Sequence, residues 1–264
     1  MLKIATWNIN SVRARIGLAV RFLAEAKPDV LCLQEIKCRE NEFPAAAFRE
    51  AGYKHLHVVG QKGWHGVAMV SKLKLEPLDG PKLCPKNEAR VAAIKLDGIE
   101  LHNLYVPAGA DVPDPEANPK FAHKLDVLDA MKREYKKRKG AGPLVIVGDF
   151  NVAPGEHDVW SHKQLLDVVS HTPQETTRLD AIRDQGGFVD LARAHRPAPE
   201  QIFTWWSYRS PDWTKNNRGR RLDHIWASAD LAPASRAEAF HIHTPCRSWE
   251  RPSDHVPVVV GLKL

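Results

Sequence analysis

The chain has 264 residues, of which 43% are hydrophobic and 27% are charged, and its formal net charge is +6. A chain of this length can bury a core without disulfide bonds, and its four cysteines form no C-x-x-C pair, so a disulfide-rich secreted domain is excluded. Its apolar runs are far shorter than the roughly 20 residues of a membrane span. We expect an intracellular protein without a signal peptide, whose basic charge suits an acidic partner such as nucleic acid.

Short apolar runs rich in β-branched residues predict strands along the whole chain. In chain order they cover 3–9, 30–34, 67–70, 91–96, 100–106, 144–147, 221–227 and 256–262. Helical periodicity predicts helices over 11–26, with Ser11 as N-cap, and over 119–138. The strongest strands are apolar on both faces. The sequence therefore predicts a layered α/β fold, with sheets packed together and helices outside, in one domain spanning 1–264.

Three long irregular segments separate these elements: 107–119, 153–176 and 207–221. Loops of this length in a compact domain are usually functional or mobile. A basic cluster, KREYKKRKG at 132–140, ends the second predicted helix. It could bind DNA, but we favour the solvated end of a helix, where cations interact well with the helix dipole.

Apolar strands repeatedly end in a carboxylate, amide, phenol or imidazole. LVIVGDFNVAP carries Asp149 and Asn151 directly after a buried run. Other strand ends carry Asn8, Asn10, Glu35, Tyr105, Asp223, His224, Asp254 and His255. One such residue alone is typical of a turn or cap. Six strand ends of this kind predict a polar cleft at one edge of the fold.

The residue types in this set indicate a hard divalent cation. Four carboxylates and three amide oxygens suit Mg²⁺ or Mn²⁺ better than zinc. Because side chains alternate along a strand, we expect Asp149 and Asn151 to point the same way, and likewise Asn8 and Asn10. A hard cation with a largely aqueous shell typically acts on phosphate esters.

Seven motifs occur in the order of one known family: WNINSVRAR, LQEIK, QKGWHGVAMVSK, YVPAG, GDFNVAP, NNRGRRLDHIWAS and PSDHVPV. From residue 4 to about 262 the chain resembles the exodeoxyribonuclease III family of abasic-site endonucleases, within the endonuclease/exonuclease/phosphatase superfamily. The resemblance implies a four-layered α/β sandwich of two packed, mostly antiparallel β-sheets flanked by helices.

The resemblance also implies the activity. We expect divalent-metal-dependent hydrolysis of DNA 5′ to abasic sites, together with 3′→5′ exonuclease and 3′-phosphatase or phosphodiesterase activity on duplex DNA. The implied cofactor is Mg²⁺ (or Mn²⁺). The implied partner is double-stranded DNA with abasic sites or blocked 3′ ends, bound by a monomer in the bacterial cytoplasm, at the nucleoid.

The family pattern assigns catalytic roles to five residues. Asp149 would orient or deprotonate the attacking water, and Asn151 would position that water or the phosphate. Tyr105 would hydrogen-bond to the scissile phosphate. His255 would contact the phosphate oxygens and be oriented by Asp223.

The pattern also assigns metal and DNA contacts. Glu35 would bind the metal ion, helped by Asn8 or Asn10 and by Asp254. The aromatic and basic segment 203–223 would contact DNA, since aromatic rings stack on bases or sugars and cations neutralise phosphates. We expect Trp206 to be part of the core. The DNA-binding candidates are Trp205, Arg209, Asn217, Arg218, Arg220, Leu222, Arg13 and Lys62.

The sequence departs from the family at two positions, of which Arg220 lies in the lesion pocket. Arg220 stands where some relatives carry an apolar or aromatic residue, and YVPAG lacks an amide found just after the Tyr-x-Pro of relatives. Residues 153–176 and 245–253 match poorly and receive no assignment.

Three alternatives fit parts of the sequence. A phosphodiesterase or phosphatase of the same superfamily with a non-DNA substrate would share the catalytic residues, but segment 203–223 favours DNA. A DNA-binding protein without catalysis would lack a metal ligand or Asp149, and neither is missing. Among the 13 histidines, the pairs 55/57 and 241/243 have no cysteine or further histidine at metal spacing, so we expect no structural zinc.

Overall fold

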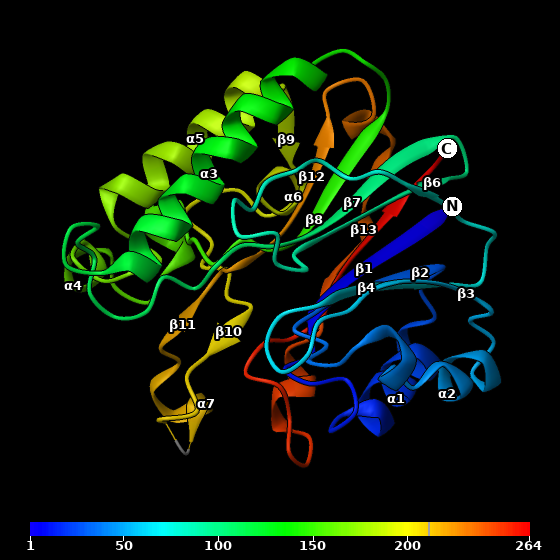
Figure 1. The fold of residues 1–264 in the computed structure, drawn as a ribbon. Coiled ribbons are helices and arrows are strands. Elements are labelled where there is room, and N and C mark those ends of the chain that lie inside the picture. Colours follow the sequence, from blue (N-terminus) through cyan, green and yellow to red (C-terminus); the bar gives the residue numbers. More distant parts are fainter. Residues whose placement is uncertain (211) are drawn as a thin grey trace.

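The computed structural model describes residues 1–210 and 212–264, and in them the strands build two six-stranded sheets and a two-stranded ribbon (Figure 1). The first sheet has the order β13-β14-β1-β2-β4-β3. Its strands are β1 (Leu2–Asn8), β2 (Val30–Gln34), β3 (His55–Val59), β4 (Val67–Ser71), β13 (Ser235–Ile242) and β14 (Val258–Leu262).

The second sheet has the order β5-β6-β7-β8-β12-β9. Its strands are β5 (Glu76–Leu78), β6 (Val91–Leu96), β7 (Ile99–Tyr105), β8 (Leu144–Asp149), β9 (Phe188–Asp190) and β12 (Asp223–Ser228). The ribbon pairs β10 (Trp205–Trp206) with β11 (Gly219–Arg220). Among the described strands, only β1–β2 and β7–β8 pair in parallel, so both sheets are mostly antiparallel, as expected.

Helices cover the outer faces of the two sheets (Figure 1). On the side of the first sheet lie α1 (Ile16–Ala26) and α2 (Ala45–Glu50), and on the side of the second lie α3 (Pro119–Arg138) and α5 (Pro173–Gly186). Shorter helices are α4 (His162–Leu165), α6 (Leu191–His195) and α7 (Trp213–Asn216). Single 3₁₀ turns occur at Glu40–Glu42, Glu156–Asp158, Ala232–Ala234 and Thr244–Ser248.

Three apolar clusters confirm the expected four-layered α/β sandwich. Because side chains alternate along a strand, Ile4 of β1 lies in the cluster between the two sheets, whereas Ala5 and Trp7 pack with α1 and α2. On β8, Val145 faces the central cluster and Ile146 packs with α3 and α5. Both sheets are therefore buried on two faces, which explains the continuous apolar runs in the sequence.

Most predicted elements agree with the structure. The eight predicted strands are present with boundaries within two residues, and the helix predicted over 119–138 is α3, capped by the Asn118 side chain. Its last turn carries Lys136, Lys137 and Arg138, as the helix-end interpretation of the basic cluster requires. The strands missed by the prediction are short or partly exposed, such as β3 and β13, whose residues lack a continuous apolar run.

The predicted start of the first helix was wrong. Helix α1 begins at Ile16, and Ser11 is no N-cap: it has a φ of +83° and donates its backbone N–H to the Glu35 carbonyl. Residues 9–15 instead form a turn that follows the end of β1. Within the described residues, no helix is long and apolar enough to cross a membrane.

Candidate active site

Strand register places three of the candidate residues in one row. Tyr105 and Asp149 are partners on the parallel strands β7 and β8, and Asp149 is opposite Asp223 on the antiparallel strand β12. On the facing sheet, β1 ends at Asn8 beside Gln34, the residue before Glu35. The sandwich thus brings five strand ends from two sheets to one edge.

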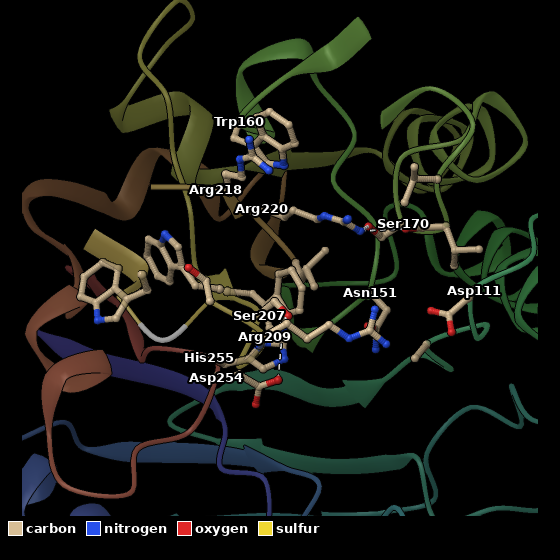
Figure 2. Close-up of a pocket in the computed structure, with 18 of the residues that line it drawn as sticks. Asp111, Asn151, Trp160, Ser170, Ser207, Arg209, Arg218, Arg220, Asp254 and His255 are labelled. Carbon is tan, nitrogen blue, oxygen red and sulfur yellow. Dashed lines mark hydrogen bonds between the residues drawn. The ribbon is translucent and has the colours of Figure 1, made fainter. Parts of the chain in front are cut away.

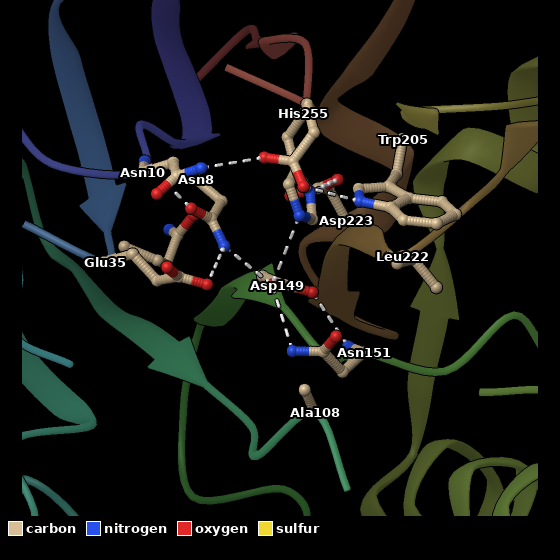
Figure 3. Close-up of polar contacts among 12 residues, drawn as sticks. Asn8, Asn10, Glu35, Ala108, Asp149, Asn151, Trp205, Leu222, Asp223 and His255 are labelled. Carbon is tan, nitrogen blue, oxygen red and sulfur yellow. Dashed lines mark hydrogen bonds and ion pairs between the residues drawn. The ribbon is translucent and has the colours of Figure 1, made fainter. Parts of the chain in front are cut away.

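A buried amide connects the two sheets at this edge. Asn8, the last residue of β1, donates its Nδ2 hydrogens to Glu35 Oε1 at 3.0 Å and to Asp149 Oδ2 at 2.9 Å (Figure 3). Tyr105 donates its hydroxyl to the same Glu35 oxygen at 2.7 Å. Glu35, Asp149 and Tyr105 therefore form one hydrogen-bonded group centred on Asn8.

Asn151 completes the surroundings of Asp149. Its backbone N–H donates to Asp149 Oδ1 at 2.9 Å, and its side-chain Nδ2 donates to Asp149 Oδ2 at 3.0 Å and to the Val106 carbonyl at 2.8 Å. Asn151, Asn10 and Glu35 have positive φ angles of 53°, 46° and 50°, so their backbone forms turns and not strands. The turn, and not the alternation of side chains along a strand, therefore brings Asn151 to Asp149. The expected proximity of Asp149 and Asn151 is present, but the alternation argument for it was wrong.

His255 is held between two carboxylates. Its Nδ1 lies 2.8 Å from Asp223 Oδ2, and its Nε2 lies 3.7 Å from Asp149 Oδ2 (Figure 3). Thr204 donates its hydroxyl to the same Asp223 oxygen at 2.6 Å. Asp223 thereby fixes the imidazole so that its Nε2 faces Asp149.

Burial and charge set the protonation of these groups. Burial, together with the nearby Asp223 charge, raises the pKa of Asp149 to about 7. Although burial opposes its protonation, the Asp223 and Asp149 carboxylates raise the pKa of His255 to about 10. Burial and the Glu35 carboxylate raise the pKa of Tyr105 well above its usual value. At neutral pH the edge therefore offers an imidazolium, a neutral phenol and a carboxyl group near its titration midpoint.

The ammonium group of Lys37 lies between two of the expected metal ligands, Glu35 and Asn10. Lys37 Nζ lies 2.9 Å from Glu35 Oε2 and 2.6 Å from Asn10 Oδ1. Burial opposes ionisation of Glu35, but the charge of Lys37 holds its pKa below the usual range. Two of the expected metal ligands thus already converge on one positive charge, so the donors present fit a hard cation.

Asn8 is arranged differently from the expected ligand. Its Nδ2 faces both carboxylates and its Oδ1 accepts the backbone N–H of Asn10 at 3.1 Å, so it serves as a hydrogen-bond donor within the cluster. Asp254 lies nearby, where Oδ1 accepts from Asn10 Nδ2 at 3.3 Å and Oδ2 accepts from the Trp205 indole at 2.9 Å. Of the alternatives Asn8 and Asn10, the geometry favours Asn10 as an oxygen donor.

A cavity of about 810 Å³ opens over this edge (Figure 2). Its lining includes Glu35, Asn151, Asp254 and His255 from the polar cluster. It also includes five of the DNA-binding candidates: Trp205, Arg209, Arg218, Arg220 and Leu222. The cavity thus joins the acidic edge to a wall of aromatic and basic side chains.

Three DNA-binding candidates lie outside the cavity lining. Asn217 is exposed but accepts a hydrogen bond from the Trp206 indole at 3.0 Å, and Trp206 is buried, as expected for a core residue. Arg13 is exposed and lies 3.8 Å from Glu42. Lys62 is exposed on the segment between β3 and β4.

Sequence reasoning missed the opposite wall of the cavity, which comes from residues 153–176. Ser170 lines this wall, and its backbone N–H donates to both oxygens of the buried Glu175 carboxylate, at 3.0 and 2.9 Å. Glu175 forms an ion pair with the buried Lys124, whose Nζ also donates to the Asn151 carbonyl at 2.7 Å. This wall is therefore rigidly connected to the turn that carries Asn151.

Arg220 crosses from one wall to the other. Its Nη1 donates to the Val169 carbonyl at 2.9 Å and to Ser170 Oγ at 2.7 Å, as Figure 2 shows, and its guanidinium lies 5.3 Å from the Trp205 ring centre. The residue that departs from the family pattern thus forms a bridge that narrows the cavity beside Trp205.

Two packed sheets with carboxylate, amide and imidazole groups at their shared edge are the arrangement of a metal-dependent phosphoester hydrolase. A family model described as the endonuclease/exonuclease/phosphatase family matches residues 5–255. The chain belongs to this family.

Individual relatives agree with this assignment. Exodeoxyribonuclease III of Haemophilus influenzae is 30% identical over 275 residues, which cover 99% of this chain and 100% of that protein. The structure of an AP endonuclease from Archaeoglobus fulgidus is similar with a TM-score of 0.92 and 35% identity over the whole of both chains. The 3′ phosphatase NExo from Neisseria, bound to product DNA hairpin, is similar with a TM-score of 0.90 and 31% identity over the whole of both chains.

Proposed function

We propose that this protein is a DNA repair nuclease that hydrolyses phosphodiesters 5′ to abasic sites, with 3′→5′ exonuclease and 3′-phosphatase activity on duplex DNA. The observation that carries the proposal is the position of Asp149. It is fully buried between Asn8, Asn151 and His255, and two of these partners, Asn151 and His255, line a cavity whose walls carry aromatic and basic side chains. The relatives named above, an exodeoxyribonuclease III, an AP endonuclease and a 3′ phosphatase, support the same class of substrate.

The catalytic roles follow from the hydrogen bonds. Asp149, with a pKa of about 7, is suited to accept a proton from the attacking water near neutral pH. Asn151 directs both side-chain hydrogens to Asp149 and Val106, so its Oδ1 is available to orient that water. The cationic His255 and the neutral Tyr105 hydroxyl would donate hydrogen bonds to phosphate oxygens as negative charge develops.

The metal ion would be Mg²⁺ (or Mn²⁺), held by Glu35 with Asn10 and Asp254. The oxygens of Glu35 and Asn10 lie where Lys37 now supplies the positive charge, so Lys37 would move away when the ion binds. When bound, a hard divalent ion would neutralise charge on the phosphate and leaving group.

The abasic site would enter the cavity between Trp205, Leu222 and the Arg220 bridge. A nucleotide without a base lacks pairing and stacking partners, so extruding it from the duplex costs less than extruding an intact one. Arg209 and Arg218, both exposed on the cavity rim, would contact phosphates, and Arg13 and Lys62 would extend that contact. Ala108, which stands where the family pattern has an amide, lines the cavity without a polar side chain (Figure 3).

We further propose that residues 1–264 act as one domain and as a monomer on chromosomal DNA in the cytoplasm. The cluster between the sheets combines residues from both, such as Ile4 and Val145, so the two sheets share one central core. The net charge of +6 supports binding to a polyanion.

The test uses a duplex oligonucleotide with one tetrahydrofuran abasic analogue, assayed with Mg²⁺, with Mn²⁺ and with EDTA. An undamaged duplex of the same sequence and a duplex with a 3′-phosphate are run in parallel. A single nick 5′ to the analogue, lost in EDTA, is the expected result.

Cleavage of the 3′-phosphate alone would overturn the abasic assignment and leave a 3′-end-processing enzyme. No metal-dependent cleavage of any DNA, combined with release of phosphate from lipid or inositol phosphates, would favour the non-DNA phosphatase of the same superfamily.

A further inference from the structure

A second group of metal-ligand side chains lies apart from the oxygen-rich cluster. Cys84 lies between β5 and β6, Glu88 lies four residues later, and His123 is on α3. Cys84 Sγ is 3.6 Å from His123 Nε2 and 3.7 Å from Glu88 Oε2, and these last two atoms are 3.4 Å apart. Three potential ligand atoms therefore form a nearly equilateral triangle.

The size of this triangle matches the face of a tetrahedral zinc site. Bonds of about 2.3 Å to sulfur and about 2.0 Å to nitrogen and oxygen, at tetrahedral angles, place the ligand atoms about 3.3–3.6 Å apart. The alternative is a set of hydrogen bonds, in which the thiol donates to Glu88 Oε2 and His123 Nε2–H donates to Glu88 Oε2 or to Cys84 Sγ. The Co²⁺ titration below distinguishes these hydrogen bonds from a bound ion.

The carboxylate is held in place by a neighbour, as metal-binding carboxylates usually are. The buried Arg90 donates its Nε to Glu88 Oε2 at 2.6 Å. On the other side, His65 Nε2 lies 3.7 Å from Glu88 Oε1, and its buried Nδ1 has no hydrogen-bond partner in the described residues. The Arg90 guanidinium thus holds Glu88 in place, and the His65 imidazole lies on the other side of the same carboxylate.

The remaining position faces a cavity. Glu88, His123 and His65 line a cavity of about 480 Å³ that also reaches Tyr105 and Glu35. A fourth ligand could therefore come from water or from a movement of His65.

We propose that Cys84, Glu88 and His123 bind a zinc ion. A thiolate and an imidazole select a borderline-soft ion, whereas the active-site cluster offers oxygen donors suited to Mg²⁺. The expectation of no structural zinc considered the histidine pairs 55/57 and 241/243. His123 lies 35 residues after Glu88 and joins it only through packing of α3 against this segment.

The ion would stabilise one wall of the active site. It would connect the segment before β6 to α3. Arg90, which holds Glu88, also donates its Nη1 to the Tyr105 carbonyl at 3.2 Å and packs its guanidinium 4.8 Å from the Tyr105 ring centre. Zinc binding would thus restrict the residues that position Tyr105.

The first test is titration of the reduced, chelator-treated full-length protein with Co²⁺ as a spectroscopic probe. One equivalent should produce thiolate-to-cobalt charge-transfer absorption in the near ultraviolet, and Zn²⁺ should displace it. Cys84→Ser should lose this band, and Cys246→Ser, a buried cysteine elsewhere, should keep it. Glu35→Gln should also keep the band, because Co²⁺ at the active site has no sulfur ligand.

A second measurement avoids substitutions that could disturb folding. Zn²⁺ should slow alkylation of Cys84 by iodoacetamide in the wild-type protein at least tenfold, with sites of labelling assigned by mass spectrometry, and Mg²⁺ should not. The proposal fails if wild-type protein gives no charge-transfer band, if the band survives in Cys84→Ser, or if Zn²⁺ leaves alkylation of Cys84 unchanged. None of these outcomes depends on nuclease activity.

Discussion

Asp149 and Asp223 are direct cross-strand partners on β8 and β12, and they share one imidazole. Two like charges opposite each other normally destabilise a pair of strands. Here His255 lies between them, and their combined charge keeps it protonated, with a pKa of about 10. The three residues therefore act as one electrostatic unit, in which a change to either carboxylate alters the other two groups.

Replacing Asp149 by Asn should separate chemistry from binding. The amide keeps the shape of the side chain but cannot accept a proton from water, so turnover of abasic duplex should fall by about 10²–10⁴-fold. Affinity should change little, since the walls of the cavity are untouched. Single-turnover cleavage and fluorescence anisotropy measure the two effects. Equal loss of both would contradict a catalytic role for Asp149.

The pH dependence of cleavage should show two limbs. As pH falls through about 7, Asp149 becomes protonated and can no longer act as a base, so kcat/KM should fall. As pH rises through about 10, His255 loses its charge and kcat/KM should fall again. In Asp223→Asn the main cause that raises the His255 pKa is removed while burial still lowers it. The alkaline limb should therefore move to lower pH, and an unmoved limb would exclude this role of Asp223.

Much of this site could be predicted because its residues end apolar strands. Asp149 and Tyr105 are the last residues of β8 and β7, Asp223 is the first residue of β12, and strand register alone aligns the three. The turn residues Asn10 and Asn151 were found for the wrong reason, because nothing in a strand pattern reveals a left-handed φ. The motifs of the family located them instead.

Other parts could not be predicted because they depend on packing between distant segments. Lys37 contacts Glu35, and Ser170 lines the cavity, from turns without periodicity. The buried Lys124–Glu175 pair connects two helices that are far apart in the sequence. A buried lysine or glutamate looks like an ordinary surface residue until its partner is known.

Glu35→Gln should raise the Mg²⁺ concentration needed for half-maximal activity. The change removes the carboxylate charge that now pairs with Lys37 at 2.9 Å, and an amide is a weaker ligand for a hard cation. Activity at saturating Mg²⁺ should recover in part. Metal titration of cleavage measures the shift, and an unchanged curve would remove Glu35 from the metal site.

Asp158→Asn should destabilise the fold. Asp158 is 1% exposed and accepts from Arg221 Nε at 2.7 Å and Nη2 at 3.0 Å, so its loss leaves a buried guanidinium with one fewer carboxylate, at a cost of about 3–5 kcal/mol. Although burial opposes ionisation, Arg221 and Arg193 lower the Asp158 pKa to about 2. This pair therefore stabilises the fold above the ordinary aspartate pKa, and its contribution is lost as pH falls towards 2.

Urea unfolding at neutral and acidic pH measures this effect. The matched control is Asp184→Asn, in an ion pair with Arg183 whose carboxylate side chain is 65% exposed, which should stay within about 0.5 kcal/mol of wild type. Equal destabilisation by the two substitutions would mean that burial of the Asp158–Arg221 pair has no special effect.

Arg220→Ala should lower discrimination against intact nucleotides. The side chain bridges Trp205 and the Val169–Ser170 wall, and this bridge narrows the cavity proposed for the abasic sugar. Without it a nucleotide that still carries its base should enter more easily. We expect the ratio of kcat/KM for the abasic analogue to that for an undamaged nucleotide at the same position to fall at least tenfold.

Arg209→Ala provides the control. Because Arg209 is exposed and would contact phosphates alone, its loss should weaken binding of both substrates alike. A ratio unchanged in Arg220→Ala would show that the bridge does not set the width of the lesion pocket.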